Sequence, residues 1–134
     1  MTIRIRPANI LDAAALVSMQ SAASAAAPHS PSDELGWQEL LANPGATNTW
    51  VAASDEVVGF IHVEAVGPGL PQLVRVNELV AGESAKTRAA LLDYALGDFG
   101  AYAEVPAHDS AFWSDHGFSE RTRNGDVVVM ERGE

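Results

Sequence analysis

Three runs of β-forming residues follow one another in the middle of the chain, and this meander constrains the fold more than any other feature. Residues 49–53 and 57–66 are rich in Val, Ala and aromatic residues and are separated only by Ser54-Asp55-Glu56, which predicts a hairpin. Residues 73–80 alternate in character and predict a third strand. In that strand one face is expected to carry Leu73, Arg75, Asn77 and Leu79, and the other Val74, Val76, Glu78 and Val80.

The segment before the meander predicts one strand and two helices. Residues 3–6 alternate between Ile and Arg, which is typical of a half-buried strand. Asn9 is expected to cap a helix whose apolar stripe is Leu16, Met19, Ala23 and Ala26. A second, shorter helix is predicted after Ser32, with apolar contacts from Leu35, Leu40 and Leu41, and it should stop at Asn43-Pro44-Gly45.

The segment after the meander predicts two helices and three strands. A helix is expected from Ser84 to Leu96 with the stripe Ala85, Ala89, Leu92 and Leu96, and Gly97 should end it. A strand over 101–105, a short helix over 110–116 and two strands around Asn124-Gly125 follow. The order β-α-α-β-β-β-α-β-α-β-β predicts an α+β fold in a single domain spanning 1–134, with the strand meander in its middle.

Composition excludes several classes of function. The chain has 134 residues and no cysteine, so it has no disulfide, thiolate metal site or cysteine nucleophile. Its formal net charge is −10, which repels a phosphate backbone and argues against nucleic-acid binding, while weakly favouring cationic ligands such as amines. No signal peptide and no membrane-spanning run is evident, and a cytoplasmic location is expected. The four histidines are scattered without metal-ligand spacing, so no metal site is expected.

Three segments, in order and at similar spacing, resemble the GNAT N-acetyltransferase superfamily. Ile5-Arg6-Pro7-Ala8 with Asp12-Ala13 resembles the opening strand and first helix of that family. Residues 73–92, which end in Ala90-Leu91-Leu92, resemble its fourth strand and the helix that receives the cofactor. Residues 112–118 resemble its C-terminal aromatic-Tyr-x-x-x-Gly-Phe segment.

The resemblance implies a central mixed, mostly antiparallel twisted sheet flanked by helices. It also implies an acetyl-CoA-dependent N-acyltransferase that acts directly on a small-molecule or peptide amine. It implies Glu78 as the base that removes the amine proton, with Glu64 as the alternative. It places the thioester at the backbone of Leu79 and Val80. The phosphates would lie at the start of the following helix, at Ser84, Ala85, Lys86, Thr87 and Arg88. His62, on a strand, is more typical of a packed residue or an edge residue than of a catalyst.

Two departures from the family pattern leave other functions open. The segment Gly82-Glu83-Ser84-Ala85-Lys86-Thr87-Arg88 lacks the paired glycines of the family's phosphate loop, where side chains would hinder close approach of phosphate. Trp113 stands where the family commonly has a tyrosine acid, and an indole N–H does not give up its proton at ordinary pH. The alternatives are a domain of this fold that acts as a binding or interaction module, in which a homodimer is conceivable, and an acyl-CoA sensor without turnover.

Overall fold

The elements of the chain follow the order expected from the sequence. The computed structural model describes residues 2–23, 27, 29–66, 73–82 and 84–133. Seven strands and four α-helices are formed by these residues: β1 (Arg4–Pro7), α1 (Ala13–Ala23), α2 (Glu34–Ala42), β2 (Thr47–Ala53), β3 (Val57–Val66), β4 (Leu73–Val80), α3 (Ala85–Leu96), β5 (Ala101–Pro106), α4 (Ser110–Asp115), β6 (Ser119–Asn124) and β7 (Val127–Arg132). Two short 3₁₀ turns, η1 (Ile10–Asp12) and η2 (Ala107–Asp109), precede α1 and α4.

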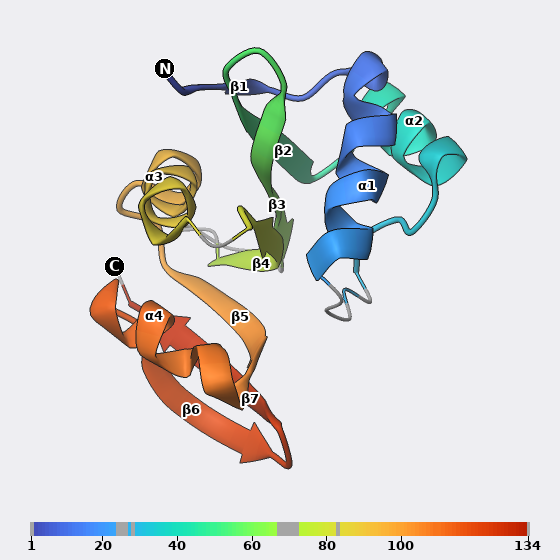
Figure 1. Cartoon of the computed structure of the whole chain (residues 1–134). Helices are drawn as coiled ribbons and strands as arrows, with labels where there is room; N and C mark the ends of the chain where they lie inside the picture. Colours follow the sequence, from blue (N-terminus) through green and yellow to red (C-terminus); the bar gives the residue numbers. More distant parts are fainter. Residues whose placement is uncertain (1, 24–26, 28, 67–72, 83, 134) are drawn as a thin grey trace.

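All seven strands belong to one sheet with the order β1-β2-β3-β4-β5-β7-β6. Every neighbouring pair is antiparallel except β4 and β5, which run parallel and are connected through α3. The predicted α+β class and the mixed, mostly antiparallel sheet are therefore confirmed. The parallel pair divides the sheet into a half made of β1 to β4 and a half made of β5, β7 and β6 (Figure 1).

Helices cover both faces of the sheet (Figure 1). On one face α1 and α2 enclose a core cluster that includes Leu16, Trp37 and Phe60, all fully buried. On the other face α3 and α4 enclose a larger cluster that includes Leu92 and Trp113. The sheet is therefore buried from both sides, and its central strands contribute side chains to both clusters.

A β-bulge in β4 changes which residues share a face. His62 of β3 pairs with Glu78 while the next residue, Val63, pairs with Val76, so Asn77 is an extra residue on β4. The expected alternation along residues 73–80 therefore fails after Val76. Val74, Val76 and Leu79 pack against the α3 side, whereas Val80 joins the cluster under α1 and α2. A bulge also bends its strand and increases the local twist.

The helices begin where the sequence predicts, but three of the predicted apolar faces differ. In α1, Ala23 was wrongly assigned to the apolar stripe, since it is exposed. Asn9 forms a capping box with Asp12 ahead of α1, and Asp33 and Ser84 cap α2 and α3 through their side chains. In α3 the buried residues are Thr87, Leu91, Leu92 and Leu96, so Ala85 and Ala89 were wrongly assigned to the core stripe. Leu35 was also wrongly assigned, since it is 64% exposed and Trp37 is the buried residue of α2.

The helix ends agree more closely with the expectation. Gly97 ends α3 and Gly117 follows α4, both with positive φ. The predicted contact of Ala26 lies outside the described residues. Among the helices that the structure describes, none combines the length and the apolar character that a membrane crossing requires.

Candidate functional site

The two halves of the sheet separate at its centre and open a cavity. β4 and β5 pair only where Val74, Arg75 and Val76 face Ala101, Tyr102 and Ala103. The bulge at Asn77 follows the last of these pairs, and from there the strands diverge. The resulting cavity has a volume of about 550 Å³ and is lined by residues of α1, β4, β5 and the starts of α3 and α4. Within it, the edge of β4 beyond Val76 has backbone groups that no residue of β5 pairs with.

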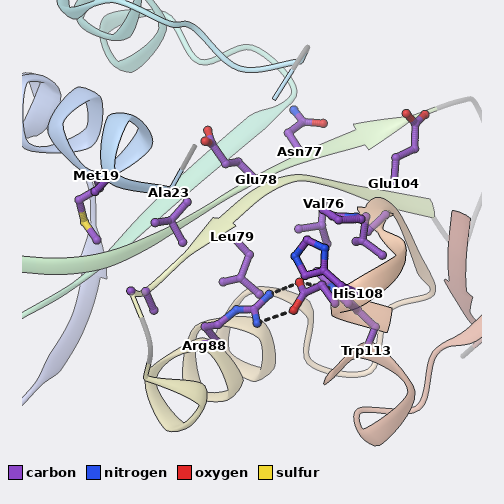
Figure 2. A pocket seen from close by; sticks show the side chains of 18 of the residues that line it. Met19, Ala23, Val76, Asn77, Glu78, Leu79, Arg88, Glu104, His108 and Trp113 are labelled. Carbon is purple, nitrogen blue, oxygen red and sulfur yellow. Dashed lines mark hydrogen bonds and ion pairs between the residues drawn. The ribbon is translucent and has the colours of Figure 1, made fainter. Parts of the chain in front are cut away.

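Two carboxylates lie on the α1 side of this cavity. Figure 2 shows Glu78 of β4 and Glu104 of β5 pointing to the same side, with Asn77 between them. Glu78 is half-buried, and burial raises its pKa. Hydrogen bonds from Gln20 and Ser30 act in the opposite direction and favour the ionised form. A carboxylate with a raised pKa at the wall of a cavity is suited to accept a proton near neutral pH.

A buried polar cluster surrounds Glu78 beneath α1 and α2. Gln20 Nε2 donates hydrogen bonds to Glu78 Oε1 and to the carbonyl of Pro31, both at 2.8 Å, and Gln20 Oε1 accepts one from Trp37 Nε1 at 3.1 Å. His62, the cross-strand neighbour of Glu78, is 1% exposed, and its Nδ1 lies 2.7 Å from Ser30 Oγ. Burial lowers the pKa of His62 to about 4, so His62 is neutral at physiological pH.

Glu64, the alternative base, is held in an ion pair outside the cavity. Its carboxylate accepts hydrogen bonds from Arg75 at 2.8 Å and Asn77 at 3.2 Å, and these partners lower its pKa. Glu64 is not among the residues that line the cavity. In the described part of the chain no group of three or more His, Asp and Glu could hold a metal ion.

Only part of the predicted cofactor segment reaches the cavity. Leu79, Val80 and Arg88 line it together with Glu78. Ser84, Ala85, Lys86 and Thr87 lie at the start of α3, outside the residues that line it. There the Ser84 side chain accepts a hydrogen bond from the Thr87 N–H at 3.2 Å, so one of the amide groups expected to bind phosphate already has a partner. Lys86 is exposed, and Glu83 lies outside the described residues.

Arg88 makes a contact in the wall of the cavity that the sequence did not suggest. Its guanidinium binds both oxygens of Asp109, at 2.9 and 2.5 Å, as the dashed lines from Arg88 in Figure 2 show. The guanidinium also stacks over the ring of Phe112, 4.1 Å from the ring centre. The Trp113 indole N–H donates to Asp109 Oδ2 at 3.2 Å. Arg88 and Asp109 therefore link the first turn of α3 to the start of α4 on the side of the cavity opposite Glu78.

Three residues of the site were missed by sequence reasoning: Gln20, Ser30 and Asp109. Gln20 had a readable signal, because it lies four residues after the buried Leu16 and so places an amide on the core-facing side of an alanine-rich helix. Ser30 and Asp109 had none, since their partners His62 and Arg88 are 32 and 21 residues away in sequence.

Several solved structures similar to this chain are described as N-acetyltransferases, although no family model and no curated protein sequence matches the chain. PaiA N-acetyltransferase from Thermoplasma acidophilum, crystallised with coenzyme A, has a TM-score of 0.79 and 16% identity over 100% of both chains. NAA60 from Arabidopsis thaliana, in complex with acetyl-CoA, has a TM-score of 0.73 and 18% identity over 97% of both chains. A GNAT-family acetyltransferase from Streptococcus pneumoniae has a TM-score of 0.73 and 17% identity over 98% of this chain and 99% of that one. The resemblance inferred from sequence is thus confirmed for the architecture: the chain has the GNAT fold.

Proposed function

We propose that the chain is an acetyl-CoA-dependent N-acyltransferase that transfers an acetyl group directly to an amine. The observation that carries this proposal is the cavity between the diverging β4 and β5, which has Glu78 in one wall and unpaired backbone of β4 along its floor. Two of the structurally similar N-acetyltransferases were crystallised with coenzyme A or acetyl-CoA, which supports the same co-substrate here. As in the sequence expectation, we propose a cytoplasmic protein.

Charge on the α1 side of the cavity supports a cationic amine as acceptor. Glu78 and Glu104 both lie there, and among the described lining residues the only Arg or Lys is Arg88, which is already paired with Asp109. An amine is protonated at neutral pH and must lose a proton before it can attack a carbonyl carbon. In our proposal Glu78 removes that proton, directly or through a water molecule. The electron pair of the amine then forms the new C–N bond as the C–S bond breaks, without a covalent enzyme intermediate. The second proton of the nitrogen passes through water to the departing thiolate.

The residues that would bind acetyl-CoA fit its thioester end better than its phosphates. When bound, acetyl-CoA supplies an activated acetyl group as a thioester. Leu79 and Val80 offer the β4 edge, whose backbone N–H groups can polarise the thioester carbonyl. At the phosphate end Ser84 already caps the Thr87 N–H, and Arg88 is bound to Asp109, which leaves the exposed Lys86 as the cation of the first turn of α3. We therefore expect weak binding, in the range of tens to hundreds of micromolar, or about −5 to −7 kcal/mol.

A second candidate is a GNAT-fold domain that binds a partner or an acyl-CoA without turnover. It is favoured by the ion pair between Arg88, which lines the cavity, and Asp109, because this pair neutralises the charge of Arg88. It is also favoured by Trp113, which stands in place of an acidic tyrosine. In this candidate the pair and the stacked Phe112 are fixed parts of the packing between α3 and α4.

Calorimetric titration of acetyl-CoA at low and high salt separates these candidates. The wild-type protein is compared with Lys86→Ala and with Arg4→Ala, a control that removes one exposed positive charge at the edge strand β1. We expect salt-sensitive binding that weakens in Lys86→Ala and is unchanged in Arg4→Ala, because exposed charge pairs are screened over about 8–10 Å at physiological ionic strength.

An acetyl-transfer assay against a panel of primary amines then tests turnover. Binding with transfer supports the enzyme, and binding without transfer to any amine supports the sensor. Absence of both heat and thermal shift at millimolar acetyl-CoA would rule out the proposed enzyme and leave the interaction module.

A further inference from the structure

We propose that Ser30 and His62 are positioning residues for Glu78, forming with it a buried hydrogen-bonded chain that runs from His62 Nδ1 through the Ser30 hydroxyl to the Glu78 carboxylate. The chain orients the carboxylate and stabilises its ionised form. This inference rests on the proposed function for its catalytic meaning, but the chain itself can be tested without any activity.

Three contacts bring these residues together. His62 and Glu78 are directly opposite each other on β3 and β4, on the face covered by α1 and α2. Ser30 Oγ lies 2.7 Å from His62 Nδ1. Gln20 Nε2 bonds both Glu78 Oε1 and the carbonyl of Pro31, the residue after Ser30, so the segment that carries Ser30 lies against the carboxylate. Ser30 also acts on Glu78 and, with Gln20, offsets part of the rise in pKa that burial causes. We infer that it does so by donating its hydroxyl proton to the carboxylate.

The proton of His62 has only one good position in this arrangement. Its ring is buried, and among the described residues Nε2 has no hydrogen-bond partner. A proton on Nε2 would bury an N–H group without an acceptor, whereas a proton on Nδ1 can be donated to Ser30 Oγ. Because the Ser30 oxygen then accepts from His62, its own proton is directed to the Glu78 carboxylate. His62 thus fixes the direction of the chain.

The charged groups near His62 do not reverse the direction of the hydrogen bonds from His62 through Ser30 to Glu78. Glu64 of β3 and Arg75 of β4 are the charged groups that act on His62, with opposite effects on its pKa, and they are paired with each other at 2.8 Å. The helices contribute Gln20 of α1 and Trp37 of α2, which are uncharged and bonded to each other. Glu78 is therefore the ionisable group in this cluster that can accept the Ser30 proton in a hydrogen bond.

Nuclear magnetic resonance tests the chain in the wild-type protein. A long-range ¹⁵N–¹H spectrum at neutral pH should show His62 protonated at Nδ1 and unprotonated at Nε2. The carboxyl ¹³C titration of Glu78 is then measured in wild type, Ser30→Ala, His62→Leu and His62→Asn. We expect the midpoint of Glu78 to rise by about one pH unit in Ser30→Ala, because a hydrogen bond to the ionised form is lost. It should rise by less in His62→Leu, because Ser30 keeps its hydroxyl but loses the donor that directs its proton. His62→Asn should restore it, since the asparagine amide can donate from the position of Nδ1. Ser54→Ala, in the turn between β2 and β3, is the serine control and should leave it unchanged.

Two results would overturn the inference: a proton on Nε2 of His62, or an unchanged Glu78 midpoint in a folded Ser30→Ala. If His62→Leu does not fold, the wild-type tautomer and the Ser30→Ala titration still decide. In the acetyl-transfer assay the acidic limb of kcat/KM should move with the Glu78 midpoint in Ser30→Ala. A shifted midpoint in a protein without transferase activity would refute the proposed enzyme and leave the chain in place.

Discussion

Acidification should destabilise the protein through His62. The folded protein holds the pKa of this histidine at about 4, whereas the ordinary value is 6.5. Between these values the unfolded chain binds a proton that the folded protein does not, so the free energy of unfolding falls as the pH falls. His62 therefore contributes stability that is present above about pH 6.5 and is lost toward pH 4.

The size of the effect follows from the two pKa values. They differ by about 2.5 pH units, which is equivalent to about 3 kcal/mol when the titration is complete. Most of this free energy is lost before the pH falls to the folded pKa of about 4. Between pH 7 and pH 5 the free energy of unfolding is expected to fall by about 2 kcal/mol. This is a sizeable part of the 5–15 kcal/mol that typically stabilises a domain, so the effect should be easy to measure.

Urea unfolding at a series of pH values between 7 and 4.5 measures this loss. His62→Asn should be less stable at neutral pH but should lack the His62 component of the pH dependence. His29→Asn, a change at an exposed histidine, should behave as wild type does. The difference between wild type and variant isolates His62 from the carboxylates. Glu78, for example, has a raised pKa, so its contribution to the free energy of unfolding changes with pH in the opposite direction. That contribution is present below the unfolded pKa of Glu78 and is lost as the pH rises through the folded pKa. Parallel pH profiles for wild type and His62→Asn would refute the assignment.

Three further changes test other parts of the site. Glu78→Gln should fold normally and lower kcat/KM by about 10²–10⁴ with loss of the acidic limb of the pH profile, and unchanged kinetics would remove Glu78 from the mechanism. Trp113→Phe should cost about 1–2 kcal/mol in thermal or urea unfolding, because it shrinks a buried side chain and removes the bond to Asp109, while the pH dependence of kcat stays the same. A folded Trp113→Phe that binds acetyl-CoA normally but has no turnover would contradict this. Asp109→Asn should free Arg88 and tighten acetyl-CoA binding by about three- to tenfold in calorimetry; weaker binding would show that the ion pair holds the site together.

The order of elements could be predicted because its signals are local. The alternation in residues 3–6, the cap at Asn9 and the glycine after Leu96 each act within a few residues, and each corresponds to an observed strand, capping box or helix end. Alanine gave the clearest error. Its side chain is tolerated on either face of a helix, so the sequence did not distinguish the exposed Ala85 from a core residue, while the buried Thr87 looked polar.

The arrangement of the site depended on contacts that no local pattern reveals. Glu78 and Leu79 could be placed on the right strand from the alternation of residues 73–80, but the extra residue at Asn77 changed the face of every residue after it in the strand. The Arg88–Asp109 pair joins two helices whose relative position follows from the whole sheet. His62 was predicted to be a packed residue, and the structure buries it, yet its bond to Ser30 depends on the path of the connection between α1 and α2.

Because of the bulge at Asn77, the opening of the cavity depends on the number of residues in β4. Removing this one residue would keep Val76, Glu78, Leu79 and Val80 on their present faces, because a strand without the insertion alternates in that same sequence. It would, however, remove the bend that follows the last pair between β4 and β5, so the two strands could continue to hydrogen-bond and close the sheet. A single-codon deletion could thus abolish the site while leaving the hydrophobic core intact. In a chain of this architecture, substitutions would adjust the chemistry of the cavity, whereas insertions and deletions in β4 would decide whether there is a cavity at all.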